Sequence, residues 1–231
     1  MKYHAIVTNA VEIIAAFSGF YYLSKNRNSK IRYFVYFLVF TILVEALGSY
    51  THLYDKIEIL STLKGTRFEQ NYWLFNIFIV VSLIFYILFY RLVLTRHFHK
   101  KVLLYLLFTS LLVIPILTFI QREEFFSNNL SYNFIWTSLS VFICVCLYFY
   151  ELLMSNKVLK FYKSTLFYIS IGLFLWWLVF PPVVFYFPFY NEDNKEMISM
   201  KGIILITTNI YLYSCLTIGF LWGKHQQNKK F

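Results

Sequence analysis

Charged residues are scarce in this chain, and seven long apolar stretches contain almost none of them. Asp, Glu, Lys and Arg make up 14% of the 231 residues, whereas hydrophobic residues make up 59%. The mean hydropathy is +0.60. This composition lies far outside the range of soluble domains. The sequence therefore predicts a protein whose main solvent is a lipid bilayer.

Cysteine is also rare, and its positions exclude a disulfide framework. The three cysteines are Cys144, Cys146 and Cys215, and all lie inside apolar stretches. Exported domains that depend on disulfides place their cysteines in polar, loop-rich sequence. We expect these three side chains to act as small packing residues.

The residue sets that catalysis needs are missing as well. The five histidines divide between the two predicted sides of the membrane, His4 and His52 on one and His97, His99 and His225 on the other. These surface positions do not bring three histidines and an acid to one cavity, as a seven-span zinc hydrolase would need. There is no glycine-rich phosphate loop and no nucleophile paired with a base. We expect no enzyme activity, no metal and no cofactor.

What the sequence does contain is seven runs of membrane-spanning length. They lie at about 5–23, 33–53, 72–94, 102–120, 132–153, 165–187 and 202–222. Each has roughly the 20 residues that an α-helix needs to cross ~30 Å of hydrocarbon. No connection between them is long enough for a soluble module. The sequence predicts an all-α, polytopic membrane protein whose residues 1–231 form one seven-helix transmembrane domain.

The basic residues are sorted between the connecting segments. Fourteen of the 21 lie on one side, which has no acidic residue in its four segments: Lys25, Arg27, Lys30, Arg32, Arg91, Arg96, Lys100, Lys101, Lys157, Lys160, Lys163, Lys224, Lys229 and Lys230. The positive-inside rule makes this side cytoplasmic and places the N-terminus outside and the C-terminus in the cytoplasm. Anionic lipid headgroups are the expected counterions of this side. We expect no direct contact with nucleic acid.

Two glutamates inside apolar stretches are the most informative polar residues. Glu12 and Glu45 lie about 10 and 12 Å below the predicted outer interface, and Asn76 and Asn209 fall in the same half of the membrane. Ser49 and His52 share a helical face with Glu45, and Tyr50 adjoins them. Buried ionisable groups usually face a bundle interior or a water-filled cavity.

These residues allow two interpretations, an outward-facing polar pocket or a network of hydrogen bonds between helices. For Glu45, we expect a partner on the first, third or seventh span, and Asn76, Asn209 and Tyr50 are the favoured candidates. A further acid, Glu151, ends the fifth span near Arg91, and an interfacial ion pair is expected there.

Several short segments resemble a group of bacterial proteins. They are Thr41-Ile-Leu-Val-Glu45-Ala-Leu-Gly48-Ser-Tyr50, then Asn76, then Asn209-Ile-Tyr-Leu-Tyr213 and Gly219-Phe-Leu-Trp222. In this pattern the chain resembles small uncharacterised seven-transmembrane-helix proteins of Bacteroidota. The resemblance implies the fold and a bacterial host, and therefore the inner (cytoplasmic) membrane. Some small membrane proteins of such bacteria accompany signalling kinases or phage-defence nucleases.

Two functions remain open from the sequence. The first is a non-enzymatic membrane sensor or accessory subunit, in which the outer pocket binds a ligand and a separate cytoplasmic partner contacts the basic residues Arg96, Lys100, Lys101, Lys157 and Lys160. The alternative is a channel, a transporter or a membrane-permeabilising effector, for example in phage defence. That alternative requires a homo-oligomer or a conformational change, because the cytoplasmic halves of the spans are almost purely apolar.

Overall fold

The computed structural model describes residues 2–26, 29–54, 57–186 and 195–228, and all of its long elements are helices. The helices are α1 (Lys2–Lys25), α2 (Ile31–Gly48), α3 (Glu58–Ser61), α4 (Tyr72–Val93), α5 (His97–Ile120), α6 (Ser131–Leu153), α7 (Thr165–Tyr186) and α8 (Lys195–Asn228). Two 3₁₀ segments, η1 (Ser49–His52) and η2 (Asn156–Lys163), follow α2 and α6. No strand occurs in the described ranges.

In the described part of the chain, six helices are long and apolar enough to cross a membrane: α2 with η1, α4, α5, α6, α7 and α8. Helices are the expected solution, because hydrocarbon offers no partner for backbone N–H and C=O groups. The all-α, multi-pass prediction is therefore confirmed for six spans. The first predicted span corresponds to α1, a helix of 24 residues. Its membrane crossing and the orientation of the chain stay predictions.

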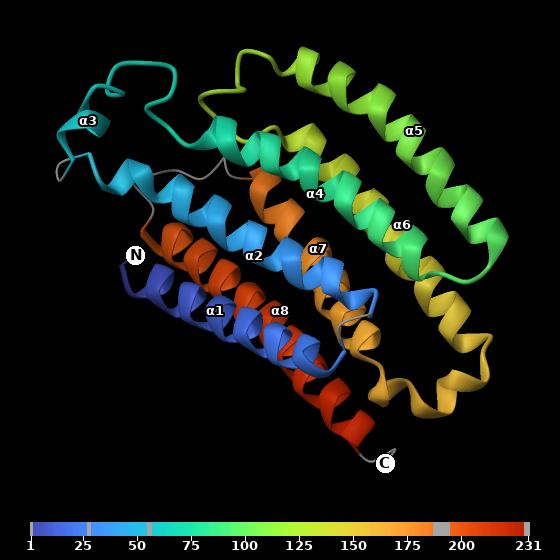
Figure 1. Cartoon of the computed structure of the whole chain (residues 1–231). Coiled ribbons are helices and arrows are strands. Elements are labelled where there is room, and N and C mark those ends of the chain that lie inside the picture. The colour runs from blue at the N-terminus through green and yellow to red at the C-terminus, as the bar shows by residue number, and fades with distance from the viewer. Residues whose placement is uncertain (1, 27–28, 55–56, 187–194, 229–231) are drawn as a thin grey trace.

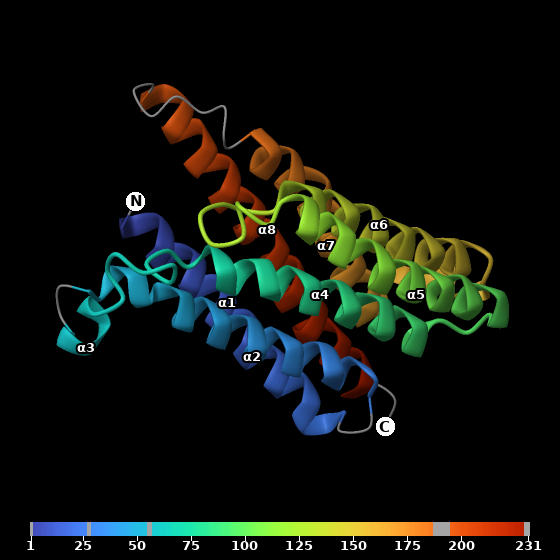
Figure 2. The same cartoon turned by 90° about the horizontal axis from the view of Figure 1, so that it is seen from above.

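Six of the long helices form a closed ring. Around it, α1 contacts α2, α2 contacts α4, α4 contacts α6, α6 contacts α7, α7 contacts α8, and α8 returns to α1. The first and last helices of the chain thus lie side by side, as Figures 1 and 2 show. Helix α5 lies outside the ring and packs on α4 and α6. Because α5 is peripheral, it exposes a long apolar face that includes Leu112 and Phe119.

The two ends of the bundle differ in charge. One end, called here the basic end, gathers the start of α2, the end of α4, the start of α5 and η2 (Figure 1). At this end the Lys30 ammonium donates a hydrogen bond of 2.7 Å to the carbonyl oxygen of Leu92. The opposite end carries α3 and the connection between α5 and α6. The basic end is the side that the charge pattern predicts to be cytoplasmic.

Candidate functional site: a central aromatic cavity

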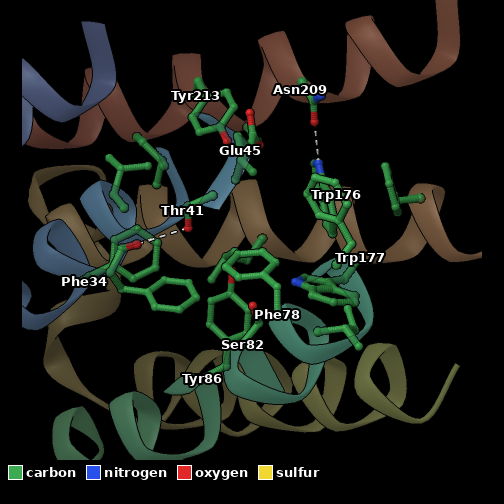
Figure 3. Close-up of a pocket in the computed structure, with 18 of the residues that line it drawn as sticks. Phe34, Thr41, Glu45, Phe78, Ser82, Tyr86, Trp176, Trp177, Asn209 and Tyr213 are labelled. Atoms are coloured by element: carbon green, nitrogen blue, oxygen red, sulfur yellow. Dashed lines mark hydrogen bonds between the residues drawn. The ribbon is translucent and has the colours of Figure 1, made fainter. Parts of the chain in front are cut away.

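A cavity of about 200 Å³ lies inside the ring of helices. Its walls come from α2, α4, α7 and α8, with Phe134 contributed by α6 (Figure 3). Ten of the nineteen lining residues are aromatic, and they include Phe37, Phe78, Tyr86, Trp176, Trp177 and Tyr213. The polar members are fewer: Thr41, Glu45, Ser82 and Asn209. The cavity is therefore mainly an aromatic chamber with a few polar groups, the usual composition of a small-molecule site.

One wall of this chamber carries a carboxyl pair. Glu45 on α2 lines the cavity, and its side chain hydrogen-bonds to that of Glu12 on α1. Glu12 is only 2% exposed, and it accepts a hydrogen bond of 2.8 Å from the Tyr213 hydroxyl of α8. Ionised carboxylates are acceptors only, so two of them cannot hydrogen-bond without a proton between them. The pair therefore holds at least one proton in this arrangement.

Close packing of α1 on its neighbours places Glu12 at this depth. The face of α1 that follows Glu12 is small, with Ala15 fully buried and Ala16 and Gly19 also buried. A β-carbon at Gly19 would lie 3.0 Å from the side chain of Val35 on α2. Small residues let membrane helices approach closely. The spacing of small residues along α1 thus brings Glu12 within reach of both α2 and α8.

Two neighbouring tryptophans of α7 line another part of the cavity. Trp176 donates a hydrogen bond of 2.8 Å from Nε1 to Oδ1 of Asn209 (Figure 3). The Nε1 atom of Trp177 is buried and has no hydrogen-bond partner of normal length and angle among the described residues. The Tyr86 ring lies edge-on to Trp177 at 6.1 Å between centroids. A buried donor without an acceptor is uncommon in folded proteins.

The residues predicted for the polar pocket fall into two groups. Glu12, Glu45 and Asn209 lie at or behind the cavity wall. Asn76 lies elsewhere: its amide donates 2.9 Å hydrogen bonds to the carbonyl oxygens of Phe125 and Asn128. Its own Oδ1 accepts a hydrogen bond of 3.1 Å from the backbone N–H of Leu130. Asn76 thus anchors the connection between α5 and α6.

Ser49, Tyr50 and His52 lie in η1, beyond the end of α2, and none of them lines the cavity. The Ser49 hydroxyl donates to the carbonyl oxygen of Glu45 at 2.9 Å, inside its own turn. The Tyr50 hydroxyl lies 2.6 Å from the carbonyl oxygen of Phe68 and 2.9 Å from that of Gln70. Glu45 therefore pairs with Glu12, which lies on the first predicted span as expected, and no hydrogen bond among the described residues joins its carboxyl to Asn76, Asn209 or Tyr50.

Another acid, Glu151, has very different hydrogen-bond partners. It accepts hydrogen bonds from the Thr95 backbone N–H at 2.8 Å, the Thr95 hydroxyl at 2.7 Å and the Arg96 backbone N–H at 2.9 Å. Its other contact is His99 Nδ1 at 2.9 Å. Thr95 and Arg96 are the two residues that precede α5, and His99 lies in its first turn. Glu151 of α6 thus holds the chain at the start of α5, and the basic side chain that contacts it is His99, whereas an ion pair near Arg91 was expected.

The predicted basic residues all lie at the basic end of the bundle. Arg96, Lys101 and Lys160 are exposed, Lys100 is half-buried, and Lys157 lies in η2. The Arg96 guanidinium lies 5.5 Å from the centroid of the Tyr150 ring. None of these cations lines the central cavity.

Sequence reasoning missed the aromatic part of the site. Tyr86, Trp176, Trp177 and Tyr213 are common residue types in membrane proteins, and aromatic residues are by default lipid anchors. One signal was available, because Tyr213 follows Asn209 by four residues and therefore shares its helical face. The rest depends on which helices are neighbours in space.

Among the described residues, no group of three or more His, Cys, Asp or Glu side chains could hold a metal ion. The chain matches no protein-family model, no curated protein and no solved structure. The function is therefore argued from the cavity and the carboxyl pair.

Proposed function

We propose that this protein is a non-enzymatic integral membrane sensor or accessory subunit that binds a small molecule in the central cavity. The observation that carries the proposal is the cavity itself, which joins an aromatic chamber to the Glu12–Glu45 pair. Such a concave, mainly apolar site with a few convergent polar groups is the default site for a small ligand. The described lining includes two aliphatic hydroxyl residues, Thr41 and Ser82, but no His, Lys or Cys that would activate them.

The position of the cavity explains how a ligand would be sensed. Helices α2, α4, α7 and α8 each contribute several lining side chains, and α1 reaches Glu45 through Glu12. A ligand that binds one packing of these helices better than another shifts the population toward that packing. The helices end together at the basic end, where Arg96, Lys101 and Lys160 are exposed. In this proposal α1 also crosses the membrane, as the first of seven spans, the basic end is cytoplasmic, and a separate soluble protein contacts that end.

A cavity-filling variant tests the proposal. Ser82 lines the cavity and is 3% exposed, so Ser82→Leu adds volume inside it. Ser214 on α8 is exposed, so Ser214→Leu is a matched control on the outer face of the bundle. Small molecules are screened for thermal stabilisation of the purified protein in nanodiscs. Molecules that stabilise the parent and Ser214→Leu should fail to stabilise Ser82→Leu. Equal stabilisation of both variants would place the ligand outside the cavity.

The carboxyl pair favours one alternative, a proton-coupled transporter. Two acids that hold a proton beside a ligand chamber have the parts needed to exchange the proton for a ligand. Reconstituted liposomes with a pH gradient would then show ligand uptake that Glu45→Gln abolishes. Liposomes that stay tight to both protons and ligand would leave the sensor as the better account.

A further inference from the structure

We propose that the ligand of the central cavity is a small organic cation, an aryl or alkyl ammonium of about eight to ten non-hydrogen atoms, whose charge is balanced by Glu45. This inference rests on the proposed function and names the chemical class of the ligand. It follows from the charge of the cavity wall, the nature of its surfaces and its size.

The ionisable charge in the cavity lining is of one sign, negative. Glu45 is the only acidic or basic residue in the described lining. Behind Glu45 lies the Glu12 carboxyl, which accepts a hydrogen bond from the Tyr213 hydroxyl. The described side-chain partner of Glu45 is therefore another acid and not a cation. A carboxylate in a low-dielectric site needs a positive partner or a proton. Since the described cavity wall has no Lys, Arg or His, only a proton or a positive ligand can balance the Glu45 carboxylate.

The surfaces that face Glu45 suit a cation. The π face of an aromatic ring is negative, and cations within about 6 Å of the ring centre are attracted to it. Phe78, Tyr86 and Trp176 come from two different helices and line the same chamber as Glu45 (Figure 3). Aliphatic walls would exclude water equally well but offer a cation no such attraction. The combination of an acid and several aromatic rings therefore favours an organic cation over a neutral apolar ligand.

A second feature indicates that the chamber is built for a guest with a polar group. Trp177 is 4% exposed, and its buried Nε1 has no hydrogen-bond partner of normal length and angle among the described residues. Figure 3 shows this nitrogen turned toward the interior of the cavity. An acceptor atom of a bound ligand, or a water that accompanies it, would satisfy this donor.

The size of the guest follows from the cavity volume. A cavity of about 150 Å³ with apolar walls accommodates benzene, which has six carbon atoms. The volume here is about 200 Å³. A guest of about eight to ten non-hydrogen atoms is the corresponding estimate, since some adjustment of side chains accompanies binding.

Binding of a cation changes the proton count of the carboxyl pair. Among the described residues that line the cavity beside Glu45, none is basic; those that titrate are Tyr86 of α4 and Tyr213 of α8, and α7 contributes only uncharged side chains. In this proposal the empty pair is neutral, with one proton on each carboxyl. On binding, the O–H bond of Glu45 breaks and its proton passes to bulk water, while Glu12 keeps its proton and donates it to the Glu45 carboxylate, which faces the cation without forming a covalent bond. Protons and the cation therefore compete, and affinity for a permanent cation rises with pH.

The experiment uses two probes of the same shape and different charge, trimethylphenylammonium and tert-butylbenzene. Titration calorimetry in nanodiscs measures their binding to the parent, to Glu45→Gln and to Glu123→Gln, a matched control in the connection between α5 and α6. We expect the cation to bind the parent and Glu123→Gln equally, and Glu45→Gln at least tenfold more weakly. Raising the pH should strengthen cation binding to the parent and leave tert-butylbenzene binding unchanged.

A second variant keeps the test valid if Glu45→Gln does not fold. Phe78→Leu removes one aromatic face, and we expect it to weaken the cation about three- to tenfold while affecting tert-butylbenzene less. Stronger binding of tert-butylbenzene than of the cation, with both lost in Ser82→Leu, would overturn the cation and leave the cavity as a ligand site. Cation binding that is independent of pH and of Glu45 would also overturn it. Binding of other molecules that Ser82→Leu does not weaken would contradict the proposed function instead.

Discussion

Glu151 and Glu45 are both acids at helix–helix contacts, but their surroundings are opposite. Glu151 accepts four hydrogen bonds at the start of α5, and each comes from a neutral or basic donor. Glu45 has one side-chain partner among the described residues, and that partner is the acid Glu12. A fully satisfied carboxylate stabilises the fold and has no capacity left for a ligand. An acid paired with another acid contributes less to stability and can respond to a proton or a cation.

The largest expected loss of stability comes from Glu151→Ala. This change removes the acceptor of the Thr95 and Arg96 backbone N–H groups and of the Thr95 hydroxyl, and it leaves His99 without this partner. We expect a loss of about 3 kcal/mol, since four hydrogen bonds are removed and each contributes about 0.5–1.5 kcal/mol. Reversible unfolding of the protein in mixed micelles measures the change. A loss below about 0.5 kcal/mol would show that water replaces the carboxylate without penalty.

Glu45→Leu is expected to cost less, about 1–2 kcal/mol, because it strands the Glu12 carboxyl without its partner. Glu45→Gln should be nearly neutral, since an amide N–H can donate to Glu12 in place of the shared proton. The difference between the two variants, measured in the same unfolding assay, reports the hydrogen bond between the side chains. Equal stability of Leu and Gln would show that this hydrogen bond contributes nothing.

Tyr213→Phe removes the hydroxyl that donates to Glu12 and leaves the ring in place. We expect a loss of about 1 kcal/mol, since single hydrogen bonds between membrane helices contribute about 0.6 kcal/mol on average. The variant should also bind trimethylphenylammonium with altered pH dependence, because Glu12 loses its second donor. An unchanged pH profile would separate Tyr213 from the carboxyl pair.

Ser49→Ala should have the smallest effect, below about 0.5 kcal/mol. The Ser49 hydroxyl is exposed and bonds only within its own turn, to the carbonyl oxygen of Glu45. Ligand binding should also be unchanged, because Ser49 does not line the cavity. A clear loss of binding in this variant would extend the site toward the end of α2.

The apolar runs predicted helix positions well where the sequence changes character sharply. The run at 72–94 became α4 (Tyr72–Val93), and the run at 132–153 became α6 (Ser131–Leu153). The predicted start of α5 was less accurate, about 102 where the helix begins at His97, because Glu151 of another helix holds the two residues that precede it. Helix α8 extends from Lys195 to Asn228, beyond both ends of the apolar run at 202–222. A helix continues as long as its backbone N–H and C=O groups hydrogen-bond within it, whether or not the residues are apolar. Hydropathy indicates which residues lie in the hydrocarbon core. The residues at which a helix begins and ends depend on the hydrogen-bond partners of its terminal backbone groups.

The sequence by itself determined the solvent of this protein and the special status of Glu12 and Glu45. Both follow from transfer free energies, which depend on residue type and on the length of a run. Only the tertiary structure decided that α1 lies beside α8, that Glu45 meets Glu12, and that Asn76 anchors a connection away from them. Pairing between helices depends on how side chains of distant segments fit together. The hydropathy pattern of the sequence indicates how deep each residue lies in the membrane, but not which neighbouring helix its side chain faces.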